Sequence, residues 1–176
     1  MELEKKAADI RILVLDVDGV LTDGKIVVNH LGEEIKSFDS KDGHGICLLL
    51  KAGIDVAIIS GRKSKAVEIR AEALGIKDIH LGINDKGPII LKLISEKRLE
   101  EKEVCCMGDD LPDIPMFQHA GISVAVSDAV REVIQSADMI TKKRGGNGAV
   151  REVCEMILRA KGKWPYAEFN SDGIGK

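Results

Sequence analysis

The sequence predicts a single α/β domain built as a doubly wound parallel sheet, with no cap domain and with a β-hairpin after the first strand. Apolar runs rich in β-branched residues alternate about six times with helical patterns, the order of a parallel sheet covered by helices on both faces. Polar motifs directly follow several of these runs. No linker and no insertion of domain size divides the 176 residues, and one domain accommodates that length.

The first strand is predicted over residues 11–15, an unbroken apolar run after Arg11 that is typical of a strand buried on both faces. It ends in Asp16, Val17, Asp18 and Gly19. Open α/β sheets bind ligands at the carboxyl ends of their strands. Asp16 and Asp18 are therefore predicted to form the centre of an active site, although Asp and Gly are also common in ordinary turns.

Two short β-rich stretches, residues 25–28 and 34–38, flank a turn-forming segment over residues 29–33. This pattern predicts a hairpin over residues 25–38. Because a two-stranded ribbon is only marginally stable alone, we expect it to pack against something, and another subunit is a candidate.

The remaining elements alternate up to about residue 161. Strands are predicted over 54–59, 79–81, 103–107, 121–125 and 139–140, and helices over 42–52, 64–74, 88–93, a short stretch ending near 119, 129–136, and 149–161. Glycines after the first two of these helices suit helix ends. Residues 163–176 are polar and glycine-rich, so we expect a loosely ordered tail after a single domain over residues 1–162.

Composition excludes several classes of protein. Hydrophobic residues make up 44% and charged residues 31% of the chain, the balance of an ordinary globular protein. A formal net charge of -3 without a long basic run disfavours a nucleic-acid partner. No apolar segment approaches the roughly 18 residues that span a bilayer, and the charged amino end lacks the apolar core of a signal peptide. We therefore expect a cytoplasmic protein with no membrane partner.

The four cysteines, at positions 47, 105, 106 and 154, lack the paired spacing of a metal site. They are predicted to be small core residues in a reducing compartment.

Further polar residues follow three later strands: Ser60, Gly61, Lys86, Asp109, Asp110 and Asp113. Because the carboxyl ends of parallel strands share one edge, these groups should converge on Asp16 and Asp18. Several carboxylates in one crevice require a cation, and hard oxygen ligands favour Mg²⁺. A lysine, a hydroxyl and a free backbone amide suit a phosphate, although Ser60 or Lys86 alone would more often be structural. Together they predict phosphoryl transfer through an aspartyl phosphate.

The ordered motifs resemble those of the haloacid dehalogenase superfamily of phosphohydrolases. Within it they are similar to the motifs of the 3-deoxy-D-manno-octulosonate 8-phosphate phosphatase family, and they lie at residues 16–24, 41–46, 60–63, 108–111 and 145–152. The resemblance covers roughly residues 10–162. It implies the Rossmann-type fold of that superfamily, and a Mg²⁺-dependent phosphatase that releases phosphate from a sugar-acid phosphate in lipopolysaccharide precursor synthesis.

The resemblance also implies catalytic roles. Asp16 is the nucleophile and a metal ligand. Asp18 gives its backbone carbonyl to the metal, and its side chain acts first as acid and then as base. Asp109 completes the protein ligands of Mg²⁺, whereas Asp110 and Asp113 support these groups or cap helices.

Binding roles follow from the same resemblance. Ser60, Gly61 and Lys86 bind the phosphoryl oxygens. Arg62 faces its own active site, while Arg70 reaches the carboxylate of substrate held by an adjacent subunit; two exposed surface arginines are nearly as plausible from the residues alone. The resemblance further implies a homotetramer in which hairpins meet and neighbouring subunits wall each site.

Three other functions remain open. The first is a phosphatase for nine-carbon, sialic acid type sugar acids. Such phosphatases tend to have Glu where this chain has Arg62, so this residue favours the eight-carbon acid. A non-catalytic oligomerisation module of the same fold would be expected to have lost one of the catalytic residues, and none is missing. A mutase or phosphotransferase normally excludes water with a cap, so the expected lack of a cap favours hydrolysis.

Overall fold

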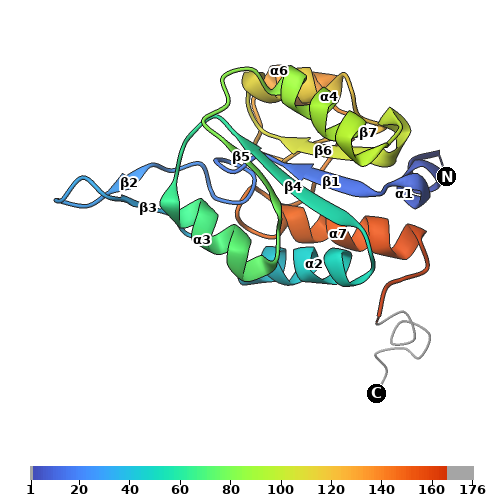
Figure 1. Cartoon of the computed structure of the whole chain (residues 1–176), viewed down its shortest axis with the longest axis horizontal. Coiled ribbons are helices and arrows are strands. Elements are labelled where there is room, and N and C mark those ends of the chain that lie inside the picture. The colour runs from blue at the N-terminus through green and yellow to red at the C-terminus, as the bar shows by residue number, and fades with distance from the viewer. Residues whose placement is uncertain (1, 166–176) are drawn as a thin grey trace.

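The computed structural model describes residues 2–165, which form an α/β body with one projecting hairpin (Figure 1). Six parallel strands pair in the order β5-β4-β1-β6-β7-β8. Their bounds are β1 Ile12–Leu15, β4 Asp55–Ser60, β5 Asp78–Leu81, β6 Val104–Gly108, β7 Ile122–Ala125 and β8 Met139–Ile140. The chain runs outward from β1 first on one side and then on the other, which confirms the predicted doubly wound sheet.

Helices cover both faces of this sheet. Their bounds are α1 Glu2–Asp9, α2 Ser40–Lys51, α3 Lys65–Leu74, α4 Lys86–Lys97, α5 Ile114–Phe117, α6 Arg131–Ser136 and α7 Ala149–Ala160, with 3-10 turns at Glu101–Glu103 and Leu111–Asp113. Helices α1, α2, α3 and α7 pack on one face, and α4, α5 and α6 on the other (Figure 1). No cap domain covers the sheet within the described part of the chain.

The helix bounds differ from the predicted ones where capping or packing decides them. Helix α2 begins two residues early because the Asp39 side chain accepts from the amides of Lys41 and Asp42. Helix α4 continues to Lys97, beyond the predicted end at residue 93. Helix α1 was not predicted at all, and it packs through Ala7.

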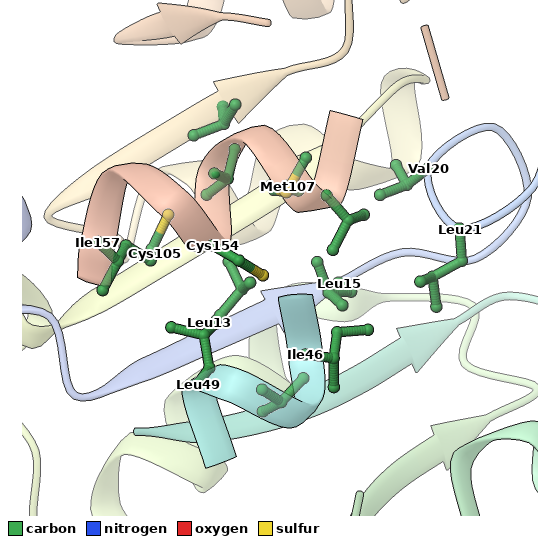
Figure 2. Packing of buried hydrophobic residues seen from close by; sticks show 14 of the residues in the cluster. Leu13, Leu15, Val20, Leu21, Ile46, Leu49, Cys105, Met107, Cys154 and Ile157 are labelled. Carbon is green, nitrogen blue, oxygen red and sulfur yellow. The ribbon is translucent and has the colours of Figure 1, made fainter. Parts of the chain in front are cut away.

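Strand β1 lies at the centre of the core because both of its faces are apolar. Leu13 and Leu15 pack with Ile46 of α2 and Ile157 of α7, as Figure 2 shows, while Val14 belongs to the cluster on the opposite face. Each fully buried aliphatic side chain contributes about 1.5–3 kcal/mol. The loop that carries the carboxylates after β1 therefore starts from a rigid support.

The prediction that the cysteines are core residues is confirmed for Cys105, Cys106 and Cys154, which are buried, but not for Cys47, which is half-buried. All four are free thiols.

The glycine-rich loop before α7, residues 145–148, packs directly against the segment after β1. A Cβ atom on Gly145 would lie 1.7 Å from the carbonyl oxygen of Gly19, so only glycine allows this approach. The amide of Gly146 donates to the carbonyl of Val20 at 2.9 Å. Backbone contact thus joins the loop at residues 145–148 to the loop after β1.

The predicted hairpin is present, with short antiparallel strands β2 Val27–Val28 and β3 Glu34–Ile35. It projects away from the body (Figure 1). Several large apolar side chains on it are 48–69% exposed: Ile26, Val27, Val28, Leu31 and Ile35. The described residues leave this apolar ribbon uncovered.

The packed core extends slightly past the domain boundary expected at residue 162. Trp164 is 8% exposed, and its ring lies 5.0 Å from the guanidinium carbon of Arg151 and 4.8 Å from that of Arg159. Residues 166–176 of the expected tail lie outside the described residues. Within residues 2–165, no helix has the length and apolar character needed to cross a membrane.

Candidate active site

A cleft of about 300 Å³ opens at the carboxyl edge of the sheet, beside the point where the strand order reverses. It is lined by Asp16, Asp18, Gly24, Gly61, Arg62, Lys86, Asp109, Asp110, Pro112 and Asp113. These residues follow β1, β4, β5 and β6 in the chain. The structure therefore gathers most of the predicted site residues around one space that a phosphate can enter.

Three carboxylates meet inside this cleft. Oxygens of Asp16, Asp109 and Asp113 all lie within 4.8 Å of one another. Burial and the Asp113 carboxylate raise the pKa of Asp16 to about 6, although Lys86 opposes the shift. Burial, with the charges of Asp16 and Asp113, raises the pKa of Asp109 to about 8. Ionising these groups together requires a cation, and their hard oxygens fit Mg²⁺.

Lys86 is the cation that the chain itself supplies. Its side chain is 3% exposed, and its Nζ lies 2.5 Å from Oδ1 of Asp16 and 2.6 Å from Oδ1 of Asp113. Burial works to lower the pKa of Lys86, but the two carboxylates outweigh it and raise the pKa. Lys86 is therefore a charged ammonium group inside the cleft, suited to binding an anionic oxygen.

Asp113 holds the other groups in place. Its Oδ1 contacts Lys86, while its Oδ2 accepts from the backbone amides of Asp109 at 2.9 Å and Asp110 at 3.3 Å. Both oxygens are thus engaged within the protein. This geometry fits a supporting role for Asp113 and leaves Asp16 and Asp109 as the freer carboxylates.

Glycines allow the loops after β1 and β6 to approach each other. Gly19 has a φ of +93°, and a Cβ atom there would lie 2.0 Å from Oδ2 of Asp109. A Cβ atom on Gly108 would lie 2.4 Å from Cβ of Asp113. Side chains at either position would push the carboxylates apart.

Two predicted site residues are not among those that line the cleft. Ser60 is buried at the end of β4, where its Oγ accepts from the Arg62 amide at 3.4 Å. Arg70 lies on α3, with its guanidinium carbon 5.9 Å from the centroid of the Phe38 ring. A Cβ atom on Gly43 of α2 would lie 2.2 Å from Nη2 of Arg70. The arginine therefore packs between α2 and α3, beside Phe38, which follows the hairpin strands.

The hairpin supplies two site residues that the sequence analysis missed, Glu34 and Lys36. Lys36 contacts Oδ1 of Asp18 with its ammonium group and lies 3.1 Å from Oε1 of Glu34. The other oxygen of Glu34 lies 2.5 Å from Nη2 of Arg62. Burial works to raise the pKa of Glu34, but contacts with Arg62 and Lys36 outweigh it and lower the pKa to about 2. Alternate residues of a strand share a face. The spacing of Glu34 and Lys36 was therefore the signal in the sequence that could have indicated that the two side chains point the same way.

The comparisons with known proteins agree with this geometry. A family model described as haloacid dehalogenase-like hydrolase matches residues 78–153. The 3-deoxy-D-manno-octulosonate 8-phosphate phosphatase of Escherichia coli strain K12 is 46% identical over 166 residues, which is 94% of this chain and 88% of that protein.

Solved structures show the same similarity. The phosphatase of that name from Yersinia pestis superposes with a TM-score of 0.90 at 44% identity, over 92% of this chain and 88% of that chain. The one from Moraxella catarrhalis, solved with a magnesium ion, a phosphate ion and a KDO molecule, superposes with a TM-score of 0.92 at 40% identity, over 97% and 98% of the two chains.

Proposed function

This chain belongs to the 3-deoxy-D-manno-octulosonate 8-phosphate phosphatase family of haloacid dehalogenase-like hydrolases, and from this membership we propose how it works. It is a Mg²⁺-dependent phosphatase that converts 3-deoxy-D-manno-octulosonate 8-phosphate to the free sugar acid and phosphate, in lipopolysaccharide precursor synthesis. The observation that carries the proposal is the cluster of Asp16, Asp109 and Asp113 with Lys86 in one open cleft.

We infer the catalytic roles from the family resemblance, and the position of the groups in the cleft supports them. Asp16 attacks phosphorus and forms an aspartyl phosphate as the bond to the sugar oxygen breaks. Asp18 gives its proton to the departing oxygen and then takes a proton from the water that cleaves the intermediate. The carboxylates of Asp16 and Asp109 and the backbone carbonyl of Asp18 would hold Mg²⁺. When bound, the ion neutralises the carboxylates and polarises the phosphoryl group.

Substrate binding involves residues of the cleft and one residue outside it. We infer that Lys86 and the Gly61 amide bind the phosphoryl oxygens from the cleft, and that the Ser60 hydroxyl, buried at the end of β4 next to Gly61, adds a third donor. Arg62, at the cleft, binds the sugar acid within the same subunit. Arg70 contacts the substrate carboxylate in an adjacent subunit, which its position outside the cleft of its own chain supports.

A panel of sugar phosphates assayed with Mg²⁺ and with a chelator tests the reaction and the substrate together. We expect kcat/KM for the eight-carbon acid phosphate to exceed that for a nine-carbon acid phosphate by at least about tenfold, a difference of about 1.4 kcal/mol. Chelation should abolish phosphate release, and added Mg²⁺ should restore it. Preference for the nine-carbon substrate would support that alternative, whereas no phosphate release from any substrate would support a non-catalytic module.

The active form that we propose is a homotetramer in which hairpins meet and neighbouring subunits wall each site. The support is the apolar ribbon of Ile26, Val27, Val28, Leu31 and Ile35, which is exposed in the isolated chain. Exposed apolar surface of this kind marks an interaction site, and two strands alone are marginally stable.

Charged substitutions on the hairpin should therefore dissociate the assembly. Replacing Val27 and Ile35, which pair across the hairpin, together by Asp removes two apolar side chains, each of which contributes about 1.5–3 kcal/mol when buried, and places like charges together. Analytical ultracentrifugation should show mainly monomer, with activity on the sugar-acid phosphate falling at least about tenfold because a wall of each site is lost. Leu91→Asp, at an exposed apolar position on α4, is the matched control. A fully active monomer would refute the shared site.

We place this enzyme in the cytoplasm. Its four cysteines are free thiols, and a reducing compartment keeps them so. The formal net charge of -3 supports a small anionic substrate bound at a local cationic site rather than a nucleic acid.

A further inference from the structure

Four charged side chains form a closed ring where the hairpin meets the cleft. Lys36 contacts Oδ1 of Asp18 and lies 3.1 Å from Oε1 of Glu34. Arg62 lies 2.5 Å from Oε2 of Glu34 through Nη2 and 3.7 Å from Oδ2 of Asp18 through Nε. Anions and cations therefore alternate around the ring, and each member contacts both of its neighbours.

Burial indicates that Lys36 has a specific role in this ring. Its side chain is 2% exposed, whereas those of Asp18 and Glu34 are 19% exposed. Placing an ammonium group out of water is costly unless it is paired, and ordering a lysine also costs side-chain entropy. A lysine that only made the hairpin soluble would extend into water.

The local strand geometry aims both hairpin residues at Asp18. Glu34 and Lys36 are two residues apart, so the pleat of an extended chain places them on one face. Ile35 between them is 53% exposed and points to the opposite face. The hairpin that we expect to join subunits is therefore also the element that contacts the acid-base carboxylate.

We propose that Lys36 and Glu34 are positioning residues for the Asp18 side chain. Lys36 holds one carboxylate oxygen of Asp18, and Glu34 fixes Lys36 and Arg62 at once through its two oxygens. The other oxygen of Asp18 lies 3.7 Å from Nε of Arg62, beyond hydrogen-bond distance, and is the one that we assign to the substrate. This inference rests on the proposed function and deepens it, because it assigns the groups that orient the proton donor.

The proton transfer explains why orientation matters. As the Asp16 oxygen bonds to phosphorus, the bond from phosphorus to the sugar oxygen breaks, and that oxygen keeps the electron pair. Asp18 takes up a proton from solvent before this step and transfers it to the same oxygen, and Lys36 keeps its own protons throughout. A misplacement of about 1 Å can lower the rate about 10²-fold, so a freely rotating Asp18 would be a poorer acid.

Leaving-group dependence separates positioning of Asp18 from other roles. The value of kcat/KM reports only steps up to departure of the leaving group, so it contains the acid step and not the later hydrolysis of the aspartyl phosphate. A p-nitrophenolate leaves readily without a proton, whereas an alkoxide or sugar oxygen needs one. Loss of orientation should therefore harm the alkyl and sugar substrates selectively.

The experiment measures kcat/KM for a series of aryl and alkyl phosphates and for the sugar-acid phosphate. We expect Lys36→Met to lower kcat/KM by about 10²-fold for alkyl and sugar substrates and by less than about threefold for p-nitrophenyl phosphate. Glu34→Gln should show the same selectivity with a loss of about tenfold. Lys36→Arg should restore most of the activity, because it keeps a cation beside Asp18. Competitive inhibition by inorganic phosphate should stay unchanged in all three variants.

Two matched controls lie on the same segment. Lys25→Met removes an exposed lysine that pairs with Asp23 at 3.0 Å. Glu33→Gln alters a carboxylate that accepts from the Asn29 side chain at 2.7 Å. In both variants, kcat/KM should depend on the leaving group in the same way as in the original chain.

Equal losses across the series, or no loss, would overturn the positioning role. If Lys36→Met fails to fold, as judged by thermal unfolding, Lys36→Arg and Glu34→Gln still decide the question. A failure of the proposed function is distinguishable, because the unaltered chain would then not hydrolyse the sugar-acid phosphate, whatever the variants do with alkyl and aryl phosphates.

Discussion

Replacing Asp16 by Asn should abolish turnover and leave the fold intact. The substitution removes the attacking carboxylate, and loss of a nucleophile lowers kcat by at least about 10³-fold, or about 4 kcal/mol of transition-state stabilisation. An amide of the same shape still offers an oxygen to Lys86, which lies 2.5 Å from Oδ1 of Asp16. Phosphate release and thermal unfolding, measured on the same preparation, check both parts of this expectation.

The matched control for this variant is Asp55→Asn. Asp55 begins β4 at the opposite edge of the sheet, where it pairs with Lys97 at 2.7 Å. Its replacement should leave turnover unchanged. Retention of more than about a tenth of the activity by Asp16→Asn would show that another group attacks phosphorus.

Replacing Lys86 by Met should both destabilise the protein and disable phosphate binding. Met fills a similar volume but leaves the buried carboxylates of Asp16 and Asp113 without their cation. Removing one partner of a buried ion pair costs about 3–5 kcal/mol. We expect a loss of this size in the free energy of unfolding at pH 8, measured in the presence of chelator, and a large fall in kcat/KM.

The destabilisation should depend on pH in a defined direction. In the original chain the pKa of Asp16 is already raised to about 6, and without Lys86 it should rise further. A carboxyl group with a raised pKa in the folded state binds a proton that the unfolded chain, with a pKa near 3.9, has lost. The contribution of this bound proton to the free energy of unfolding is therefore present at low pH and is lost as the pH rises through the raised pKa. The deficit of the variant should be small near pH 5 and full near pH 8.

Lys97→Met provides the comparison for this effect. Lys97 also lies between two carboxylates, at 2.7 Å from Asp55 and 2.9 Å from Asp78. Asp55 is 56% exposed and Asp78 31% exposed, so both carboxylates remain in contact with water, and pairs of this kind contribute at most about 1 kcal/mol. A pH-independent deficit in Lys86→Met, or an equal one in Lys97→Met, would contradict the electrostatic account.

The fold was largely predictable because local patterns specify it. The unbroken apolar run of β1 and the alternation of strands with helices led to the observed sheet. The errors fall where the local signal is weak. Helix α1 is short and highly charged, and it is held through Ala7 by packing that no local pattern reveals.

The site was predictable in part for a related reason. Asp16, Lys86 and Asp109 follow strands of one parallel sheet, so strand order alone brings them to one edge. Glu34 and Lys36 were missed because they lie on a hairpin outside that sheet. Their partners are 28 and 18 residues away in the chain, and nothing local to the hairpin indicates which way it folds.

The amino-acid sequence by itself determined which chemistry this protein can perform, since the types and order of its polar residues after apolar strands specify a carboxylate cluster with a lysine. Only the tertiary structure decided how those groups are held. It placed Asp42 of α2 to accept from the amides of Gly148 and Arg151, and Lys36 against Asp18. The physical reason is range: propensity and periodicity act within a few residues, whereas these contacts depend on packing between distant segments.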